Sequence, residues 1–201
     1  MAYEYHVFLS YRRHGEWPEW VSTVFYPIFS HWLGEELGED AEIFFDQNME
    51  AGVPWPTNLG HALAHSRVLV PLLSRQYFNS HWCKAELSHM LARQKSFGLD
   101  ASRRGLIVPA TIHDGQDLPS CVAQITRVRL EDYANIRLAK NSPTEEELSR
   151  RICNWVPDIA KAIHAVPECD PEWRHLAIEE FLKLLATPQS KQRKIPSLGD
   201  L

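Results

Sequence analysis

Trp82 and Glu86 lie in the segment HWCKAELSHM (81–90), four residues apart. If the segment is helical, positions i and i+4 share one face. An indole can stack on a nucleotide base, while a carboxylate accepts hydrogen bonds from ribose hydroxyls and stabilises positive charge that develops on the sugar. In most proteins the same pair is only a packed tryptophan and a solvated acid. The rest of the sequence must therefore decide between the two.

Alternating strand and helix patterns supply the elements that position this pair. Five apolar runs have the composition of buried strands, the last of them at an edge: 5–10, 41–46, 67–74, 105–112 and 125–132. Helical patterns lie between most of them and after the last, over 20–37, 58–66, 83–98 and 144–165. Pro27 is expected to kink or divide the first helix. The alternation predicts an α/β, flavodoxin-like three-layer fold with five mainly parallel strands, the first and third central.

Capping residues and an apolar stripe mark two of the later helices. Thr57 can cap the helix over 58–66, and Thr144 with Glu147 has the spacing of a capping box for 144–165. The last helix should cover the sheet through an apolar stripe made of Leu148, Ile152, Ile159 and Ile163. A further helix is expected near 171–186, with disorder beyond about Thr187 because the tail has little apolar content.

The strand order predicts where a ligand binds. In a 2-1-3-4-5 sheet the crevice lies outside the carboxyl ends of the first and third strands. Ser10 and Ser74 end those two strands, and the polar stretch SYRRHGEW begins at Ser10. The helix bearing Glu86 starts beside the same crevice. The pair of interest is therefore expected at the ligand-binding edge of the sheet.

Composition and charge exclude several classes of protein. The chain has 201 residues, 44% of them hydrophobic, and a formal net charge of -5 with no long basic run. These values argue against disorder and against nucleic acid or an anionic membrane as the main partner. The sequence shows no leader and no apolar run long enough to span a bilayer, so we expect a cytoplasmic protein. The cysteines are widely spaced and are interpreted as free thiols: Cys83, Cys121, Cys153 and Cys169.

Three other chemistries have weaker support. His61 and His65 have the i, i+4 spacing of a helical metal chelate, but no HExxH or cysteine pair accompanies them, so no metal is predicted. Cys83 follows Trp82 and is more simply a small buried residue than a nucleophile. The chain has no GxGxxG and no Walker loop, which argues against redox use of NAD and against phosphoryl transfer.

Several segments together resemble a TIR (Toll/interleukin-1 receptor) domain in order and spacing. They are VFLSYRR (7–13), IFFDQNMEAGVPW (43–55), VLVPLLS (68–74), WCKAEL (82–87) and IVPATIHDGQDLP (107–119). His6 departs from the family pattern, which often has an acid in the first strand. The resemblance implies a TIR domain over 1–166, followed by a C-terminal helix and flexible tail over 167–201.

The resemblance implies NAD⁺ as a substrate, with no separate cofactor. TIR enzymes that cleave the nicotinamide–ribose bond have a glutamate at the position of Glu86, which makes it the expected catalytic residue. The loop DQNMEAGVPWP (46–56) is expected to close over the nucleotide or to pack on a neighbouring subunit. The residues expected to bind NAD⁺ are Ser10, Tyr11, Arg12, Arg13, Asp46, Gly52, Trp55, Ser74 and Trp82. For Arg13 a solvent-facing charge, and for Trp55 packing onto its own domain, are equally simple interpretations.

Two further functions remain open at this point. The family also contains adaptors that only recruit other TIR domains, so a non-catalytic interaction module is the alternative to an enzyme. An enzyme in turn has two possible products, ADP-ribose or a cyclic ADP-ribose signal for a separate effector. The resemblance to stand-alone bacterial TIR proteins favours a role in antiviral defence, with self-association through TIR–TIR contacts.

Overall fold

The computed structural model describes residues 3–45, 55–99, 105–114, 118–168, 179 and 183, with backbone only at 55–57, 120 and 121. In this part of the chain the strands form one five-stranded sheet in the order β2-β1-β3-β4-β5, and every neighbouring pair is parallel. The strands are β1 (Tyr5–Tyr11), β2 (Ile43–Phe44), β3 (Ser66–Leu73), β4 (Ala110–Thr111) and β5 (Val128–Arg129). The predicted order is confirmed, with β1 and β3 inside the sheet.

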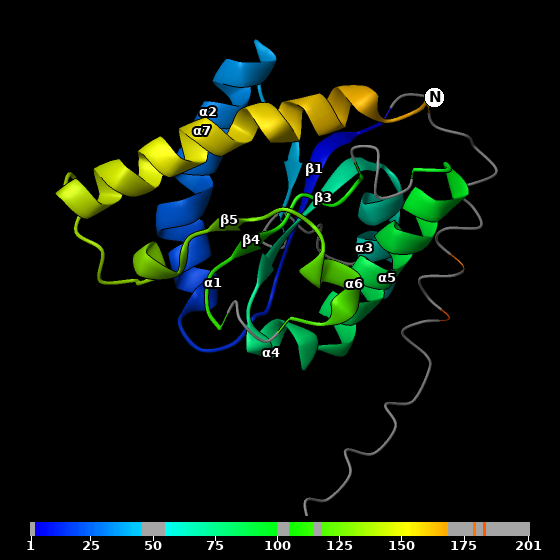
Figure 1. The fold of residues 1–201 in the computed structure, drawn as a ribbon, viewed down its shortest axis with the longest axis horizontal. Coiled ribbons are helices and arrows are strands. Elements are labelled where there is room, and N and C mark those ends of the chain that lie inside the picture. The colour runs from blue at the N-terminus through cyan, green and yellow to red at the C-terminus, as the bar shows by residue number, and fades with distance from the viewer. Residues whose placement is uncertain are drawn as a thin grey trace, which may run out of the picture.

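Helices cover both faces of the sheet, as the three-layer prediction required. Figure 1 shows α2 and α7 on one side and α3 and α5 on the other. The described helices are α1 (Trp17–Trp20), the π-helix η1 (Val21–Phe25), α2 (Tyr26–Leu37), α3 (Trp55–Ala64), α4 (Arg75–Phe78), α5 (His81–Ser96), α6 (Ser120–Ala123), the 3₁₀-helix η3 (Glu131–Tyr133) and α7 (Pro143–Ala165). Because both faces are covered, β1 and β3 are almost continuously apolar and buried.

The predicted fourth strand, 105–112, is reduced to two short pieces. Ile107 forms an isolated bridge with Leu69, and only Ala110–Thr111 pairs with the end of β3. Pro109 lies between the pieces and has no N–H to donate to a ladder. Its carbonyl accepts instead from the N–H of Val128 at 3.2 Å, which aligns β5. Proline therefore shortens β4 without breaking the sheet, and β5 is the predicted edge strand.

The helical segment 20–37 is divided at the predicted place. Residues 21–25 form a π-helix, in which the N–H of Tyr26 bonds to the carbonyl of Val21. Pro27 lies in the first turn of α2, where its missing N–H costs no helical hydrogen bond. At the other end, Gly38 adopts φ 72° and donates to Gly34, which ends the helix.

Two helix starts differ from the sequence interpretation. Helix α3 begins at Trp55, two residues before the expected cap Thr57. Helix α7 is capped by Ser142, whose hydroxyl accepts from the N–H of Glu145 at 3.2 Å, and not by the expected box of Thr144 and Glu147. Pro143 at the first helical position explains the shift, because its fixed φ suits that position.

The apolar residues of α7 confirm the expected covering of the sheet. The four residues of the predicted stripe are buried, namely Leu148, Ile152, Ile159 and Ile163. At the C-terminal side, only Glu179 and Lys183 of the predicted helix 171–186 are described, both as helical. The rest of that helix and the tail beyond Thr187 lie outside the described residues, so both remain predictions.

Cys83 and Cys153 are free thiols, as expected, whereas the side chains of Cys121 and Cys169 lie outside the described part of the chain. Within the described residues, no helix is long and apolar enough to cross a membrane.

Candidate active site

The carboxyl ends of β1 and β3 bring the polar residues of the candidate site to one edge of the sheet. In the β1–β3 ladder Ser10 is opposite Pro71, and Tyr11 is opposite Leu72. Ser74 follows the end of β3 directly and begins the α4–α5 region. The parallel arrangement therefore places Ser10 near the helices that follow β3, as the crevice argument predicted.

Glu86 is buried, at 6% exposure, and is bonded to the end of β1. Its Oε2 atom accepts a hydrogen bond of 2.5 Å from the Ser10 hydroxyl. The Ser10 oxygen lies 2.8 Å from the Tyr77 hydroxyl. Because the Ser10 proton is used by Glu86, Tyr77 must donate to Ser10. The three side chains form a directed chain of hydrogen bonds that ends on the carboxylate.

Tyr77 was not identified as a site residue from the sequence. Burial raises the pKa of the Tyr77 hydroxyl well above its usual value, and nearby Cys83 and Glu86 add to the shift. The hydroxyl therefore stays protonated and remains a donor. The available signal was the short helix after a strand-ending serine, since Ser74 accepts from the Tyr77 N–H at 3.2 Å and so caps α4.

Ser80 is a second residue that the sequence interpretation missed. It caps α5 by accepting from the N–H of Cys83 at 3.3 Å, and thereby fixes where the helix of Trp82 and Glu86 begins. With that start, Trp82 and Glu86 lie on one face of α5, and both line the same pocket. The i, i+4 prediction from which the sequence argument started describes their positions correctly.

The pocket beside Glu86 has a volume of about 60 Å³ and gathers most of the expected site residues. Six of them line it, namely Ser10, Tyr11, Arg12, Arg13, Trp82 and Glu86. The other lining residues are Phe8, Leu9, Phe44, Leu59, Ser80 and Cys83. Ser74 is not among them: its side chain is buried and its oxygen is used as the α4 cap.

The remaining expected residues belong to the segment that precedes α3. Asp46 and Gly52 lie outside the described residues. Trp55 is described only as the first residue of α3, so it stands at a helix start and not within the loop where the sequence placed it. The roles proposed for these three residues remain predictions.

Arg12 offers an unused donor in the pocket. Its Nε atom is buried and has no hydrogen-bond partner among the described residues. A buried donor without an acceptor costs free energy, and an anionic or hydroxyl-rich ligand would remove that cost. The guanidinium charge also acts on Cys83, where it opposes the rise in the thiol pKa that burial causes. Arg12 is therefore the candidate contact for a phosphate or ribose group.

Cys83 has the environment of a packing residue. Its thiol donates to the Tyr11 carbonyl at 3.5 Å, and its side chain is buried. Burial, with Glu86 adding to it, raises the pKa of Cys83 far above the usual value. Because the thiolate is the nucleophilic form, this environment argues against nucleophilic catalysis by Cys83.

A larger hollow of about 820 Å³ lies elsewhere, between α5, the β4–β5 edge and α7. Its polar lining includes Gln94, Arg127, Glu147 and Arg151, and it does not include Glu86. None of the described carboxylates that line it is buried. The smaller pocket, with its buried acid and unused arginine donor, is the better candidate for chemistry.

The fold and this pocket define a flavodoxin-like α/β domain with a buried carboxylate at the crevice. The family model described as "TIR domain" matches residues 7–152, and the chain therefore belongs to the TIR domain family. A search of curated proteins gave no match. Among solved structures, the TIR domains of the activated Roq1 resistosome that directly recognises the pathogen effector XopQ match with 20% identity, a TM-score of 0.42, and coverage of 89% of this chain and 98% of that one.

Proposed function

We propose that this protein is an NAD⁺-consuming enzyme that cleaves the nicotinamide–ribose bond with Glu86 as its catalytic carboxylate. The observation that supports the proposal most is the setting of Glu86, which is buried, bonded to Ser10 and open to a pocket shared with Trp82 and Arg12. Burying a carboxylate costs free energy, and a position that served only for packing would be filled at lower cost by an apolar residue. The resemblance to TIR enzymes, which have a glutamate here, gives the substrate.

The proposed reaction needs one carboxylate and no general acid. The bond between the ribose carbon C1′ and the nicotinamide nitrogen breaks, its electron pair leaves with nicotinamide, and nicotinamide departs neutral. Positive charge develops on the ribose, and the fixed carboxylate of Glu86 stabilises that charge. Glycosidases commonly use a second carboxyl group to protonate the leaving group, which is unnecessary when the leaving group becomes neutral on departure.

The fate of the ribosyl cation decides the product. Water attack at C1′ releases ADP-ribose and a proton, whereas attack by a nucleophile within the same ADP-ribose gives a cyclic product. Both outcomes share the bond-breaking step and the role of Glu86. We propose that the reaction serves antiviral defence, and that a cyclic product acts as a signal for a separate effector.

The small volume of the pocket supports the proposal that NAD⁺ binds only when the pocket opens or when a second subunit completes it. The volume of about 60 Å³ beside Glu86 is far below the roughly 300–1,000 Å³ of typical small-molecule sites. A dinucleotide therefore requires the walls to move, or a second subunit to supply part of the site. The segment that the sequence interpretation assigned to a loop, 46–56, is the proposed element for either role, because Phe44 before it and Leu59 after it both line this pocket. Self-association through TIR–TIR contacts is accordingly part of the proposal.

The test compares Glu86→Gln with the parent and with Glu35→Gln, a control acid that is exposed on α2. The glutamine keeps the shape and an oxygen that accepts from Ser10, but it removes the charge. We expect a loss on the order of 3 kcal/mol of transition-state stabilisation, or about 100-fold or more in the rate of nicotinamide release. Thermal unfolding of all three proteins is measured alongside the rates, and the control should match the parent in both.

Each alternative outcome has a definite meaning. A parental rate for Glu86→Gln would show that the catalytic assignment is wrong. Unfolding of this variant, with Glu35→Gln intact, would show that Glu86 has a structural role. If the parent releases no nicotinamide at any protein concentration, the enzyme proposal fails and the interaction module is the better description.

A further inference from the structure

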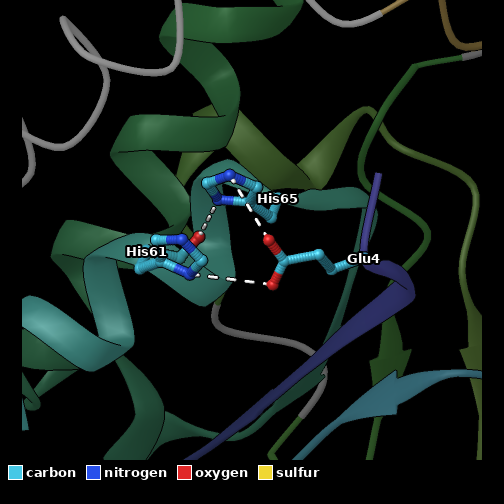
Figure 2. A group of neighbouring side chains, drawn as sticks. All are labelled: Glu4, His61 and His65. Atoms are coloured by element: carbon cyan, nitrogen blue, oxygen red, sulfur yellow. Dashed lines mark hydrogen bonds and ion pairs between the residues drawn. The ribbon is translucent and has the colours of Figure 1, made fainter. Parts of the chain in front are cut away.

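Glu4, His61 and His65 form a cluster away from the Glu86 pocket, at the amino end of β1. His61 lies in the last turn of α3, and His65 directly follows this helix. Figure 2 shows both imidazole rings facing the Glu4 carboxylate. The Nδ1 atom of His61 lies 3.8 Å from Oε2 of Glu4, and the Nε2 atom of His65 lies 3.6 Å from Oε1. One potential ligand atom from each residue lies within 4.8 Å of the others. The sequence showed the two histidines but not the third ligand.

Backbone hydrogen bonds hold the three residues in place. The N–H groups of Glu4 and Tyr5 both donate to the carbonyl of His65, at 3.0 and 3.2 Å. The N–H of His65 donates to the carbonyl of His61 at 3.0 Å, which continues the last turn of α3. The backbones of Glu4, His61 and His65 are therefore held close together by hydrogen bonds, which fixes the positions from which the three side chains extend.

The tautomer of His65 is the one that a metal ligand requires. Its Nδ1 atom lies 2.8 Å from the carbonyl oxygen of His61, and a carbonyl oxygen can only accept, so Nδ1 bears the proton. In the neutral ring this leaves the lone pair on Nε2, the atom on the Glu4 side. Metal-bound histidines typically donate their other ring N–H to a carbonyl or carboxylate in this way.

The separations suit ligands that share a cation. Both nitrogen–oxygen distances exceed the usual hydrogen-bond range of about 2.7–3.2 Å. Two ligands at roughly 2.0–2.1 Å from a tetrahedral Zn²⁺ lie about 3.4 Å apart, close to the distances of 3.6 and 3.8 Å found here. The imidazoles are stacked, with centroids 3.8 Å apart and an interplanar angle of 19°, so one ring must turn about its side-chain torsions before both lone pairs point at one ion. The negative end of the helix dipole also favours a cation there.

We propose that Glu4, His61 and His65 bind a divalent transition-metal ion, with Zn²⁺ as the physiological candidate. Two imidazoles and one carboxylate are a ligand set that Zn²⁺ accepts, with a fourth position left for water or another exchangeable ligand. The exposure of the side chains fits such an accessible site, at 9% for His65, 47% for His61 and 48% for Glu4. A bound ion would fasten the start of β1 to the end of α3.

The experiment measures metal binding directly and does not depend on NAD cleavage. Protein without a polyhistidine tag is treated with a chelator, and Zn²⁺ is then titrated in competition with a chromophoric chelator. We expect one equivalent at micromolar or tighter affinity, together with a rise of several degrees in the thermal midpoint. Co²⁺ should bind in the same place and give the visible absorption of a tetrahedral site without a thiolate charge-transfer band. Mg²⁺ and Ca²⁺, which prefer oxygen ligands, should not compete.

Matched variants separate this site from binding elsewhere. Glu4→Gln and His61→Asn change partly exposed side chains, so folding should survive, and each should weaken Zn²⁺ binding at least about 10-fold. His164→Asn, an exposed histidine on α7, should bind as the parent does. The proposal is wrong if the parent binds no stoichiometric Zn²⁺, or if Glu4→Gln and His61→Asn together leave the affinity unchanged.

Discussion

Ser10 connects the catalytic candidate to the fold, because its hydroxyl donates to Glu86 and accepts from Tyr77. Ser10→Ala removes both bonds at once and leaves two buried polar groups with fewer partners. We expect a loss of about 1–3 kcal/mol in the free energy of unfolding. Because the carboxylate also loses a positioning contact, nicotinamide release should slow through kcat more than through KM. Urea unfolding and steady-state kinetics measure the two effects.

Tyr77→Phe provides the comparison for Ser10→Ala. It removes one hydroxyl of the chain but leaves the bond between Ser10 and Glu86 in place. Its effect on stability should be the smaller of the two, and its kcat should stay near that of the parent. Equal kcat losses in the two variants would mean that contact between Ser10 and Glu86 is not what positions the carboxylate.

For single residues, the sequence predicted which side chains of one segment lie together, and it missed contacts between residues of distant segments. The shared face of Trp82 and Glu86 follows from helix geometry alone, and it is found in the structure. The bond between Ser10 and Tyr77 joins residues far apart in the chain and depends on how α4 packs against β1. No spacing rule within a single segment could have predicted that bond, and the same holds for Glu4 beside His61 and His65.

The start of α7 gives a prediction about a single element. Ser142 caps the helix, whereas Thr144 lies within its first turn. Ser142→Ala should therefore lower the free energy of unfolding by about 1 kcal/mol, because it removes the acceptor for the Glu145 N–H. Thr144→Ala should change it by much less. Urea unfolding of both variants checks the assignment, and the reverse ranking would restore the capping box expected from the sequence.

Helix α5 should make stability depend on pH through His89. Burial, with the Arg93 charge adding to it, lowers the pKa of His89 from 6.5 to about 4. Between these values the unfolded chain binds more protons than the folded protein, so the stability that neutral His89 contributes is present above pH 6.5 and is lost as the pH falls toward 4. From pH 7 to pH 5 the loss should be about 2 kcal/mol.

His89→Gln should reduce that pH dependence, because glutamine does not titrate. Urea unfolding at pH 7 and pH 5 measures the difference for each protein. His164→Gln is the control, since His164 is exposed on the same chain and should keep the parental slope. If His89→Gln loses as much stability as the parent between pH 7 and pH 5, groups other than His89 cause the pH dependence.

The strands and the long helices were predicted in type and order, whereas the short helices α4 and α6 and several boundaries were not. Buried parallel strands are continuous apolar runs, which is why β1 and β3 were evident from composition. The interruption of β4 depends on one residue, Pro109, and on which neighbour uses its carbonyl. The start of α7 depends on competition between Ser142 and Thr144 as the capping residue, which Pro143 at the first helical position decides.

For the whole molecule, we expect activity to require assembly. If stacked subunits complete the small pocket beside Glu86, nicotinamide release should rise more steeply than linearly with protein concentration. Activity assays over a dilution series, together with sedimentation velocity at the same concentrations, measure this relation. Constant specific activity in a sample that remains monomeric throughout would contradict the expectation.

The position of Cys83 allows the opening of the pocket to be measured without any substrate. Its thiol is 3% exposed and lies against the Tyr11 carbonyl, so a maleimide can reach it only when the pocket walls move apart. Cys153, half-buried on α7, supplies an internal reference in the same molecule. The ratio of the two alkylation rates, resolved by peptide mass spectrometry, therefore measures how often the pocket opens. Any change in that ratio as subunits associate would report how assembly alters the opening equilibrium.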